Sequence, residues 1–140
     1  MMLDIIVPGN PVGKARPRFN GAVVYTPSIT RDYEQLVAIT FRRKYGALKF
    51  DKPKALHMTI KAYFGIPKKD VRKTRNDKLL GKLRPTKKPD WDNIGKVIAD
   101  ALNGVAYDDD SQIVSADVIK LYSIEPRVEV MIFEEKYEEG

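Results

Sequence analysis

Residues 56–64 carry the pattern that most restricts how this chain can fold. Apolar and polar or amphipathic side chains alternate there, in the order Leu56, His57, Met58, Thr59, Ile60, Lys61, Ala62, Tyr63 and Phe64. Because successive side chains of a strand point to opposite faces, the alternation predicts a strand with one face in the core and the other toward solvent. His57, the single histidine of the chain, lies on the polar face, and we interpret it as a solvated or cross-strand residue rather than a general base.

Four further segments predict strands and their turns. Leu3–Val7 is a short apolar strand, and Ala22–Tyr25 predicts a second strand that pairs back onto it. Ile113–Ser123 carries apolar residues on both faces, which favours a central position in a sheet. Glu125–Arg127 predicts a turn, after which Val128–Phe133 returns as the hairpin partner of the preceding strand.

Residues 28–45 predict a helix that packs on the core. Ser28 or Thr30 is suited to its N-cap, and Asp32 and Glu34 fall in its first turn. Gly46 ends it. The positions that follow i, i+3, i+4, i+7 spacing are Tyr33, Leu36, Val37, Thr40, Phe41 and Lys44. We therefore assign this helix a packing role.

Length and composition indicate one domain over residues 1–140. A chain of 140 residues with 43% hydrophobic content can bury roughly two thirds of its unfolded surface, so it should fold without disulfides or a structural metal. The absence of cysteine excludes disulfides and thiolate metal sites and favours a reducing compartment. No apolar run reaches the length of a signal peptide or a membrane span, so we expect a cytoplasmic protein with no membrane partner.

Positive charge is concentrated in residues 67–88. The chain has a net charge of +6, and this segment alone carries ten lysines and arginines against two aspartates. Such a segment is suited to binding a polyanion, and the alternative is a lysine-rich linker that only improves solubility. Residues 71–83 predict either a loose helix or a mobile stretch that a partner orders. Residues 134–140 form an acidic tail that we expect to be frayed.

A second basic segment lies near the N-terminus. Lys14, Arg16 and Arg18 alternate with small or rigid residues after a turn at residues 8–11. In an extended segment that proline stiffens, this alternation puts the three cations on one side, where they suit a row of phosphate contacts. The alternative is an ordinary solvated basic loop.

Residues 92–103 predict an amphipathic helix with an unusual polar face. The stripe expected to face the core consists of Ile94, Val97, Ile98, Ala101 and Leu102, with the preceding Trp91. The polar face gathers Asp92, Asn93, Lys96, Asp100 and Asn103. Gly95 and Ala99 lie between the two faces, where small side chains leave room for a bulky group. Asn103-Gly104 is suited to ending the helix with an αL cap.

Five carboxylates lie close to the two ends of this helix in sequence. Asp90 and Asp92 bracket its start, and Asp108-Asp109-Asp110 follows a short connection after it. If the loop folds back on the helix start, the carboxylates share one small volume, and two of them about 4 Å apart repel by roughly 4 kcal/mol at an effective dielectric of 20. Such a cluster needs a cation or raised pKa values, and oxygen ligands favour Mg²⁺ or Mn²⁺. The alternative is a helix whose acidic start only complements the helix dipole.

Three motifs combine these features. They are Gly9-x-Pro11-x-x-Lys14-x-Arg16-Pro17-Arg18, then Lys88-Pro89-Asp90-x-Asp92-Asn93-x-x-Lys96-x-x-x-Asp100-Ala101-Leu102-Asn103-Gly104, and finally Asp109-Asp110-x-Gln112. Together they resemble the RusA family of Holliday junction resolvases, which are crossover junction endodeoxyribonucleases often carried by prophages. The resemblance runs from about Asp4 to Val130, and the second motif is its most specific part.

The resemblance implies a fold, an activity and a cofactor. The fold would be α+β, a mixed β-sheet flanked by helices, forming a two-fold homodimer. The activity would be paired, symmetric nicking of four-way DNA junctions in recombination and repair, with Mg²⁺ (Mn²⁺ as a substitute) and no organic cofactor. The family's metal-binding carboxylates carry over to Asp90, Asp92 and Asp110, and its catalytic lysine to Lys96. The run of three aspartates allows another register, but Gln112 favours Asp109-Asp110 as the family pair.

The remaining site residues divide into DNA contacts and supports. The cations expected to bind backbone phosphates are Lys14, Arg16, Arg18, Lys68, Lys69, Arg72, Lys73, Arg75, Lys87 and Lys88. The residues expected to support the carboxylates are Asn93, Asp100, Asp109 and Gln112. Two other functions remain open: a junction-binding protein without catalysis, and a metal-dependent nuclease for forks, flaps or RNA.

Overall fold

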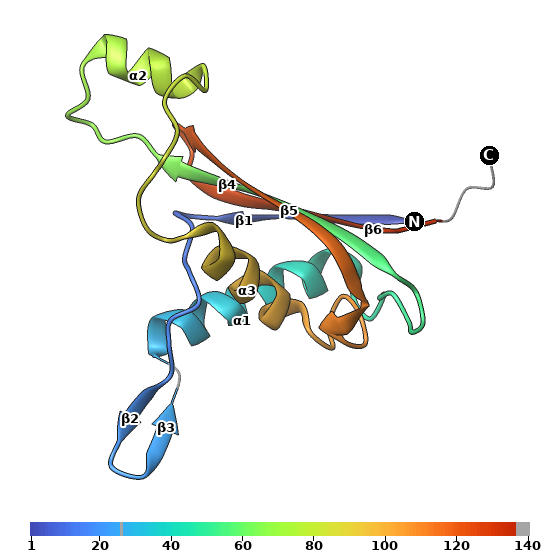
Figure 1. The fold of residues 1–140 in the computed structure, drawn as a ribbon. Coiled ribbons are helices and arrows are strands. Elements are labelled where there is room, and N and C mark those ends of the chain that lie inside the picture. The colour runs from blue at the N-terminus through green and yellow to red at the C-terminus, as the bar shows by residue number, and fades with distance from the viewer. Residues whose placement is uncertain (26, 137–140) are drawn as a thin grey trace.

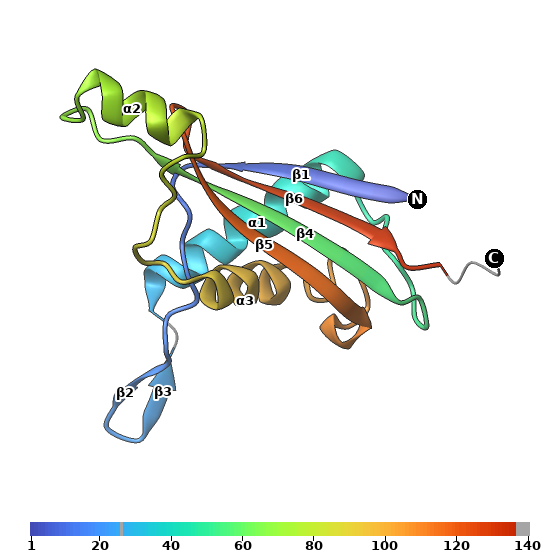
Figure 2. The same cartoon turned by 45° about the horizontal axis from the view of Figure 1, so that its top comes forward.

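The computed structural model describes residues 1–25 and 27–136 and has an α+β fold (Figure 1). Its mixed sheet has the order β1 (Met2–Pro8), β6 (Arg127–Glu134), β4 (Leu56–Gly65) and β5 (Ile113–Ser123). Helices α1 (Ser28–Tyr45) and α3 (Trp91–Leu102) lie against one face of this sheet (Figure 2). The α+β class with a mixed sheet is therefore confirmed. Residues 137–140 of the predicted acidic tail lie outside the described residues.

Strand β4 is the interior strand on which the core is built. Its side chains alternate between buried and half-buried along the whole strand, as the sequence pattern predicts. It pairs antiparallel with β6 and parallel with β5. On the outer face, His57 lies across from β5, with Nδ1 2.6 Å from Ser115 Oγ and Nε2 2.9 Å from Asp117 Oδ2. The interpretation of His57 as a cross-strand residue is therefore confirmed.

The predicted neighbours of β5 and β6 are wrong. β5 is an edge strand rather than a central one, and β6 pairs with β1 and β4 rather than forming a hairpin with β5. The turn after Ser123 does reverse the chain, but a reversal does not make two strands adjacent, and β4 lies between them. The inner face of β5 is apolar because α3 covers it, with Val118 next to Gly95 of the helix.

Helix α1 packs beneath the sheet beside α3. It buries Thr30, Tyr33, Val37 and Phe41 and ends at Gly46, which has a φ of +62°. The predicted side-chain cap is wrong, because the helix begins after Pro27 and no side chain caps it. Starting the helix at Ser28 also moves the predicted acidic residues out of the first turn.

The segment predicted to pair with β1 forms a separate hairpin instead. β2 (Arg18–Asn20) pairs with β3 (Val23–Tyr25), and this two-stranded ribbon projects away from the main sheet (Figure 1). The physical reason lies in the extended residues before it, which run along the start of α3. The backbone N–H of Lys14 donates to the carbonyl oxygen of Asn93 at 2.9 Å, so the chain has left the sheet before β2 begins.

The basic segment contains a helix, which is one of the two predicted alternatives. α2 (Arg72–Leu79) has no buried residue of its own. It is held at the end of β5 by Lys78, which pairs with Asp70 at 2.5 Å and lies over the Tyr122 ring at 4.7 Å. Arg84 Nε also donates to the Lys120 carbonyl oxygen at 2.7 Å. None of the described helices is both long and apolar enough to cross a membrane.

Candidate active site

Helix α3 presents the central motif along one exposed face. The predicted apolar stripe is confirmed from Ile94 onward, since all five of its residues are buried. Trp91 was predicted to join this stripe, and that is wrong: its side chain is 65% exposed. The covered part of the helix begins one turn after Trp91. Gly95 lets α3 approach β5, because a Cβ atom there would already lie 3.4 Å from Val118.

Asp90 and Asp92 lie at the N-terminal end of α3 with their side chains exposed. Asp90 is the N-cap residue, with extended backbone angles, but its carboxylate makes no capping hydrogen bond. An aspartate at this position usually accepts a hydrogen bond from the first turn. Its carboxylate therefore remains available for another ligand. Lys96 is exposed one turn after Asp92 and forms no ion pair within the described part of the chain.

The N-terminal loop packs directly against this helix start. A Cβ atom on Gly13 would lie 2.8 Å from Pro89 Cβ and 3.1 Å from Asn93 Cβ, so no larger residue fits at that position. Between the loop and the helix lies an open pocket lined by Gly13, Lys14, Ala15, Arg16, Lys88, Pro89, Asp90 and Asn93. The pocket thus brings Asp90 together with two exposed cations, Arg16 and Lys88.

A second pocket, next to the first, is also lined by exposed cations. It shares Lys88 and Pro89 with the first and adds Lys68 and Lys87. We call the row from Arg16 through Lys88 and Lys87 to Lys68 the basic track. Beyond it lie the exposed cations Lys69, Arg72, Lys73 and Arg75, on or next to α2. The two predicted basic segments therefore meet at Asp90.

Lys14 does not belong to this track, which corrects the predicted row of three cations. Its ammonium lies between the two helices, 2.8 Å from Glu34 of α1 and 3.1 Å from Asp100 of α3, and the side chain is only 19% exposed. Partial burial opposes its charge, but the hydrogen bonds to Glu34 and Asp100 outweigh that effect and raise the pKa of Lys14. Lys14 therefore ties the loop to both helices, and two carboxylates already satisfy it.

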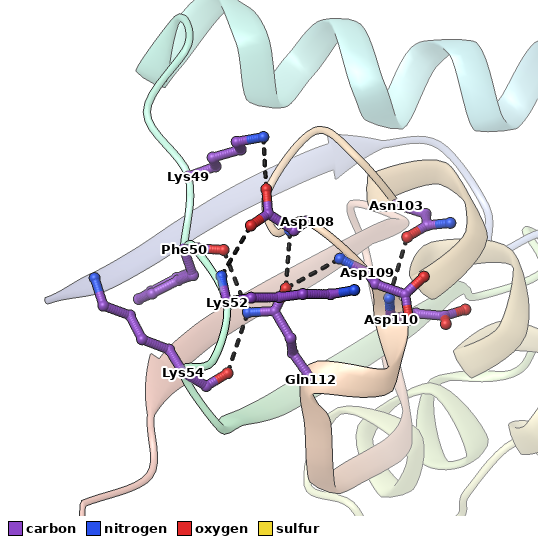
Figure 3. Close-up of polar contacts among 9 residues, drawn as sticks. All are labelled: Lys49, Phe50, Lys52, Lys54, Asn103, Asp108, Asp109, Asp110 and Gln112. Carbon is purple, nitrogen blue, oxygen red and sulfur yellow. Dashed lines mark hydrogen bonds and ion pairs between the residues drawn. The ribbon is translucent and has the colours of Figure 1, made fainter.

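The three consecutive aspartates have different surroundings (Figure 3). Asp108 accepts hydrogen bonds from Lys49 Nζ at 2.7 Å and from the Lys52 backbone N–H at 2.8 Å, and these bonds hold the pKa of its carboxyl below the usual value. Asp109 caps the short 3-10 helix η1 (Asp110–Gln112) by accepting from the Ser111 N–H at 3.0 Å, and hydrogen bonds from the Ser111 side chain and backbone lower the pKa of its carboxyl. Both carboxylates therefore have structural partners.

Gln112 fixes the conformation of this loop. Its side chain is 6% exposed, and the oxygen and nitrogen of its amide bond to two different segments of the chain. Oε1 accepts from the backbone N–H groups of Asp108 and Asp109 at 2.9 and 3.0 Å, while Nε2 donates to the carbonyl oxygens of Phe50 and Lys54 at 3.3 and 3.1 Å. The glutamine therefore joins the aspartate loop to the segment before β4.

Asp110 is anchored at the far end of α3 from Asp90. Its backbone N–H donates to Asn103 Oδ1 at 3.1 Å, and its carboxylate is exposed (Figure 3). Asp92 and Asn103 are separated by about 16 Å of helix rise. Among residues 1–25 and 27–136, no three His, Cys, Asp or Glu side chains are grouped so that they could hold a metal ion. The shared site of Asp90, Asp92 and Asp110 thus stays a prediction.

The pair at the helix start nevertheless fits a hard divalent cation. Mg²⁺ is usually held in proteins by one or two carboxylates, while water and substrate phosphate complete its octahedron. Asp90 and Asp92 supply exposed oxygen donors of this kind, and the chain has no cysteine that would favour a softer metal.

Sequence reasoning missed two supporting residues. Glu34 was assigned only to the first turn of its helix, yet it binds Lys14. Lys49 was not predicted to have a role, yet its ammonium pairs with the carboxylate of Asp108. Each pair joins residues distant in sequence, so no local spacing signals it. Both pairs follow from how α1 and its following loop pack on the motif.

Comparisons with known proteins identify the family of this chain. The family described as "Endodeoxyribonuclease RusA" matches residues 8–133, which include the loop, α3 and the aspartate loop. An uncharacterized protein of Bacillus subtilis (strain 168), YqaN, is 41% identical over 138 residues, covering 94% of this chain and 96% of that protein. Both matches extend over nearly the whole chain. The chain therefore belongs to the RusA family of endodeoxyribonucleases.

Proposed function

We propose that this chain is a divalent-metal-dependent endonuclease that resolves four-way DNA junctions by paired, symmetric nicks. The observation that carries the proposal is the pocket at the start of α3, where Asp90 lies beside Arg16 and Lys88. Cations that bind phosphate and carboxylates that bind a metal ion are two components of metal-assisted phosphodiester hydrolysis, in which the metal also activates the attacking water. Membership of an endodeoxyribonuclease family makes DNA the expected polyanion.

Asp90 and Asp92 are the proposed metal ligands, with Mg²⁺ or Mn²⁺ as the ion, and Asp110, at the far end of α3, is proposed as a further catalytic carboxylate outside this pair. When bound, the ion would lower the pKa of a coordinated water and polarise the scissile phosphate. The chain's own cations then have distinct tasks. Arg16 and Lys88 would hold the backbone on the two sides of the pocket, and Lys96, which has no ion pair among the described residues, would stabilise charge on a phosphate oxygen or the leaving oxygen.

A second copy of the chain would supply the second nick. A four-way junction presents two equivalent strands, so a two-fold dimer with two sites matches its symmetry. The sheet face opposite α1 and α3 supports this, because it carries exposed apolar side chains such as Met2 (54%) and Ile6 (59%). Four strands spaced about 4.8 Å apart and about 25 Å long give roughly 500 Å² per copy. Two such faces total roughly 1,000 Å², about the minimum area expected of a biological interface.

The test is cleavage of a synthetic four-way junction in Mg²⁺ by wild type and Asp90→Asn, with binding of both measured in Ca²⁺. Symmetric nicks by the wild type and binding without cutting by the variant would support the proposal. An Asp90→Asn protein that cuts at the wild-type rate would remove the proposed metal site. Binding without cutting by both proteins would favour a junction-binding protein. Cleavage of forks or flaps but not of junctions would keep the chemistry and change the substrate.

A further inference from the structure

Trp91 is an exposed aromatic side chain at the start of α3, between the two proposed metal ligands in sequence. It is the single tryptophan of the chain, the first residue of α3, and lies between Asp90 and Asp92. Its side chain is 65% exposed, although tryptophan is on average among the more buried residues. Within the described part of the chain, it takes part in no aromatic or cation–π pair.

The surroundings of Trp91 favour a nucleic acid over a protein as its partner. A protein surface that covered the indole would also desolvate Asp90 and Asp92 on either side of it, and burying unpaired carboxylates is costly. A nucleotide could place its base on the indole and its phosphate against Arg16 and Lys88 in the pocket that Asp90 lines, and a metal ion at the carboxylates would offset their repulsion of the phosphate. A cationic groove with an exposed aromatic ring is the usual arrangement for binding unpaired strands.

We propose that Trp91 stacks on a base that is unstacked at the branch point, next to the phosphodiester bound at Asp90 and Asp92. This inference rests on the proposed function and adds to it the source of selectivity for branched DNA. In continuous duplex, bases are stacked at about 3.4 Å and leave no space for an indole. At a branch, the strands diverge and a base face becomes accessible. Trp91 therefore recognises the branch, while the basic track binds any DNA backbone.

Intrinsic fluorescence tests this contact directly, because Trp91 is the only tryptophan. A four-way junction titrated into the wild-type protein in Ca²⁺ should quench the emission strongly. A linear duplex of matched length and composition, brought to the same bound fraction, should quench it little. Equal quenching by the two DNAs at equal saturation would overturn the inference.

Two variants separate stacking from a structural role. Trp91→Ala should weaken junction binding by roughly 5- to 100-fold, the usual range for loss of one stacked base, and leave duplex binding unchanged. Trp91→Phe should restore most of the junction affinity because it keeps an aromatic face. Since the side chain is exposed, the melting temperature of Trp91→Ala should match that of the wild type. A Trp91→Ala protein with wild-type junction affinity would refute the stacking role.

The remaining outcomes distinguish a failure of this inference from a failure of the proposed function on which it rests. A wild type that cuts junctions while Trp91→Ala cuts them at the same KM and kcat would refute the role of Trp91 and keep the nuclease. A wild type that neither binds nor cuts branched DNA would refute both. Shielding of Trp91 from acrylamide in the DNA-free protein, together with a monomeric Trp91→Ala variant, would overturn the inference by assigning the indole to an interface between copies.

Discussion

Replacing Gln112 by methionine should destabilise the fold more than any exposed change in the same loop. Methionine has nearly the length and volume of glutamine, so the packing is retained and only the amide is lost. The substitution leaves four backbone groups without their partner: the N–H groups of Asp108 and Asp109, and the carbonyl oxygens of Phe50 and Lys54.

The size of the effect follows from how deeply these groups lie. The bond to Phe50 is buried, and an unsatisfied buried group costs about 1–3 kcal/mol. The other three bonds are partly buried, so water can replace part of each, and we assign them about 0.5 kcal/mol apiece. The loss is then about 3 kcal/mol. With an unfolding entropy of about 2.1 cal/mol/K per residue over 140 residues, this lowers the Tm by about 10 °C.

Thermal unfolding followed by circular dichroism measures this shift. Ser111→Ala is the matched control, because Ser111 is exposed, lies in the same 3-10 helix and keeps its backbone N–H bond to Asp109, so the change removes at most one exposed side-chain hydrogen bond. We expect its Tm to stay within about 2 °C of the wild type. A Gln112→Met protein that melts within 2 °C of the Ser111→Ala control would refute the clamp role derived from its four hydrogen bonds.

Three further predictions concern the site. Asp110→Asn should lower the rate of junction cleavage by about 100-fold or more with little change in Tm, whereas Asp108→Asn should lower Tm and keep most of the activity; equal activity losses in single-turnover assays would contradict this division. Lys96→Met should bind junctions in Ca²⁺ like the wild type and cut them about 10²–10³-fold more slowly. A wild-type cleavage rate in this variant would refute a catalytic role for Lys96. For DNA binding, the slope of the logarithm of the association constant against the logarithm of the salt concentration should decrease in magnitude by about one in Arg16→Ala. Lys14→Ala should leave this slope unchanged and reduce stability. A slope that falls as much in Lys14→Ala as in Arg16→Ala would show that Lys14 contacts DNA.

The parts of the fold that sequence predicted are those where periodicity reports burial. β4 and the stripe of α3 are correct because a side chain's spacing decides which face it occupies. The same signal says nothing about which strands become neighbours, so β5 was placed in the centre of the sheet although it is an edge strand. Trp91 shows the related limit along a helix. Its angular position matched the stripe, but the part of the helix that the core covers begins one turn after it.

Sequence spacing predicts which candidate residues lie together at α3, but not how the rest of the candidate site is arranged. The central motif brings Asp90, Asp92 and Lys96 onto one helix, where spacing fixes their positions. Asp110 depends on a loop whose course is set by Gln112 and Asn103, and sequence spacing does not reveal where such a loop is attached. Lys14 fits its motif equally well as a phosphate contact or an internal ion pair, and only the packing of α1 decides between them.

Charge segregation at the start of α3 has a consequence for how the site handles DNA. Lys88 and Asp90 are two residues apart and both exposed, yet neither forms an ion pair within residues 1–25 and 27–136. The cations therefore keep their attraction for phosphate, and the carboxylates keep their repulsion of it. Phosphates should bind along the basic track without a divalent ion, but a phosphate that approaches Asp90 and Asp92 has to meet a cation there. Under the proposed function we therefore expect binding and cutting to be separable: lysine and arginine would hold the backbone, and a metal ion at the two aspartates would complete the scissile position.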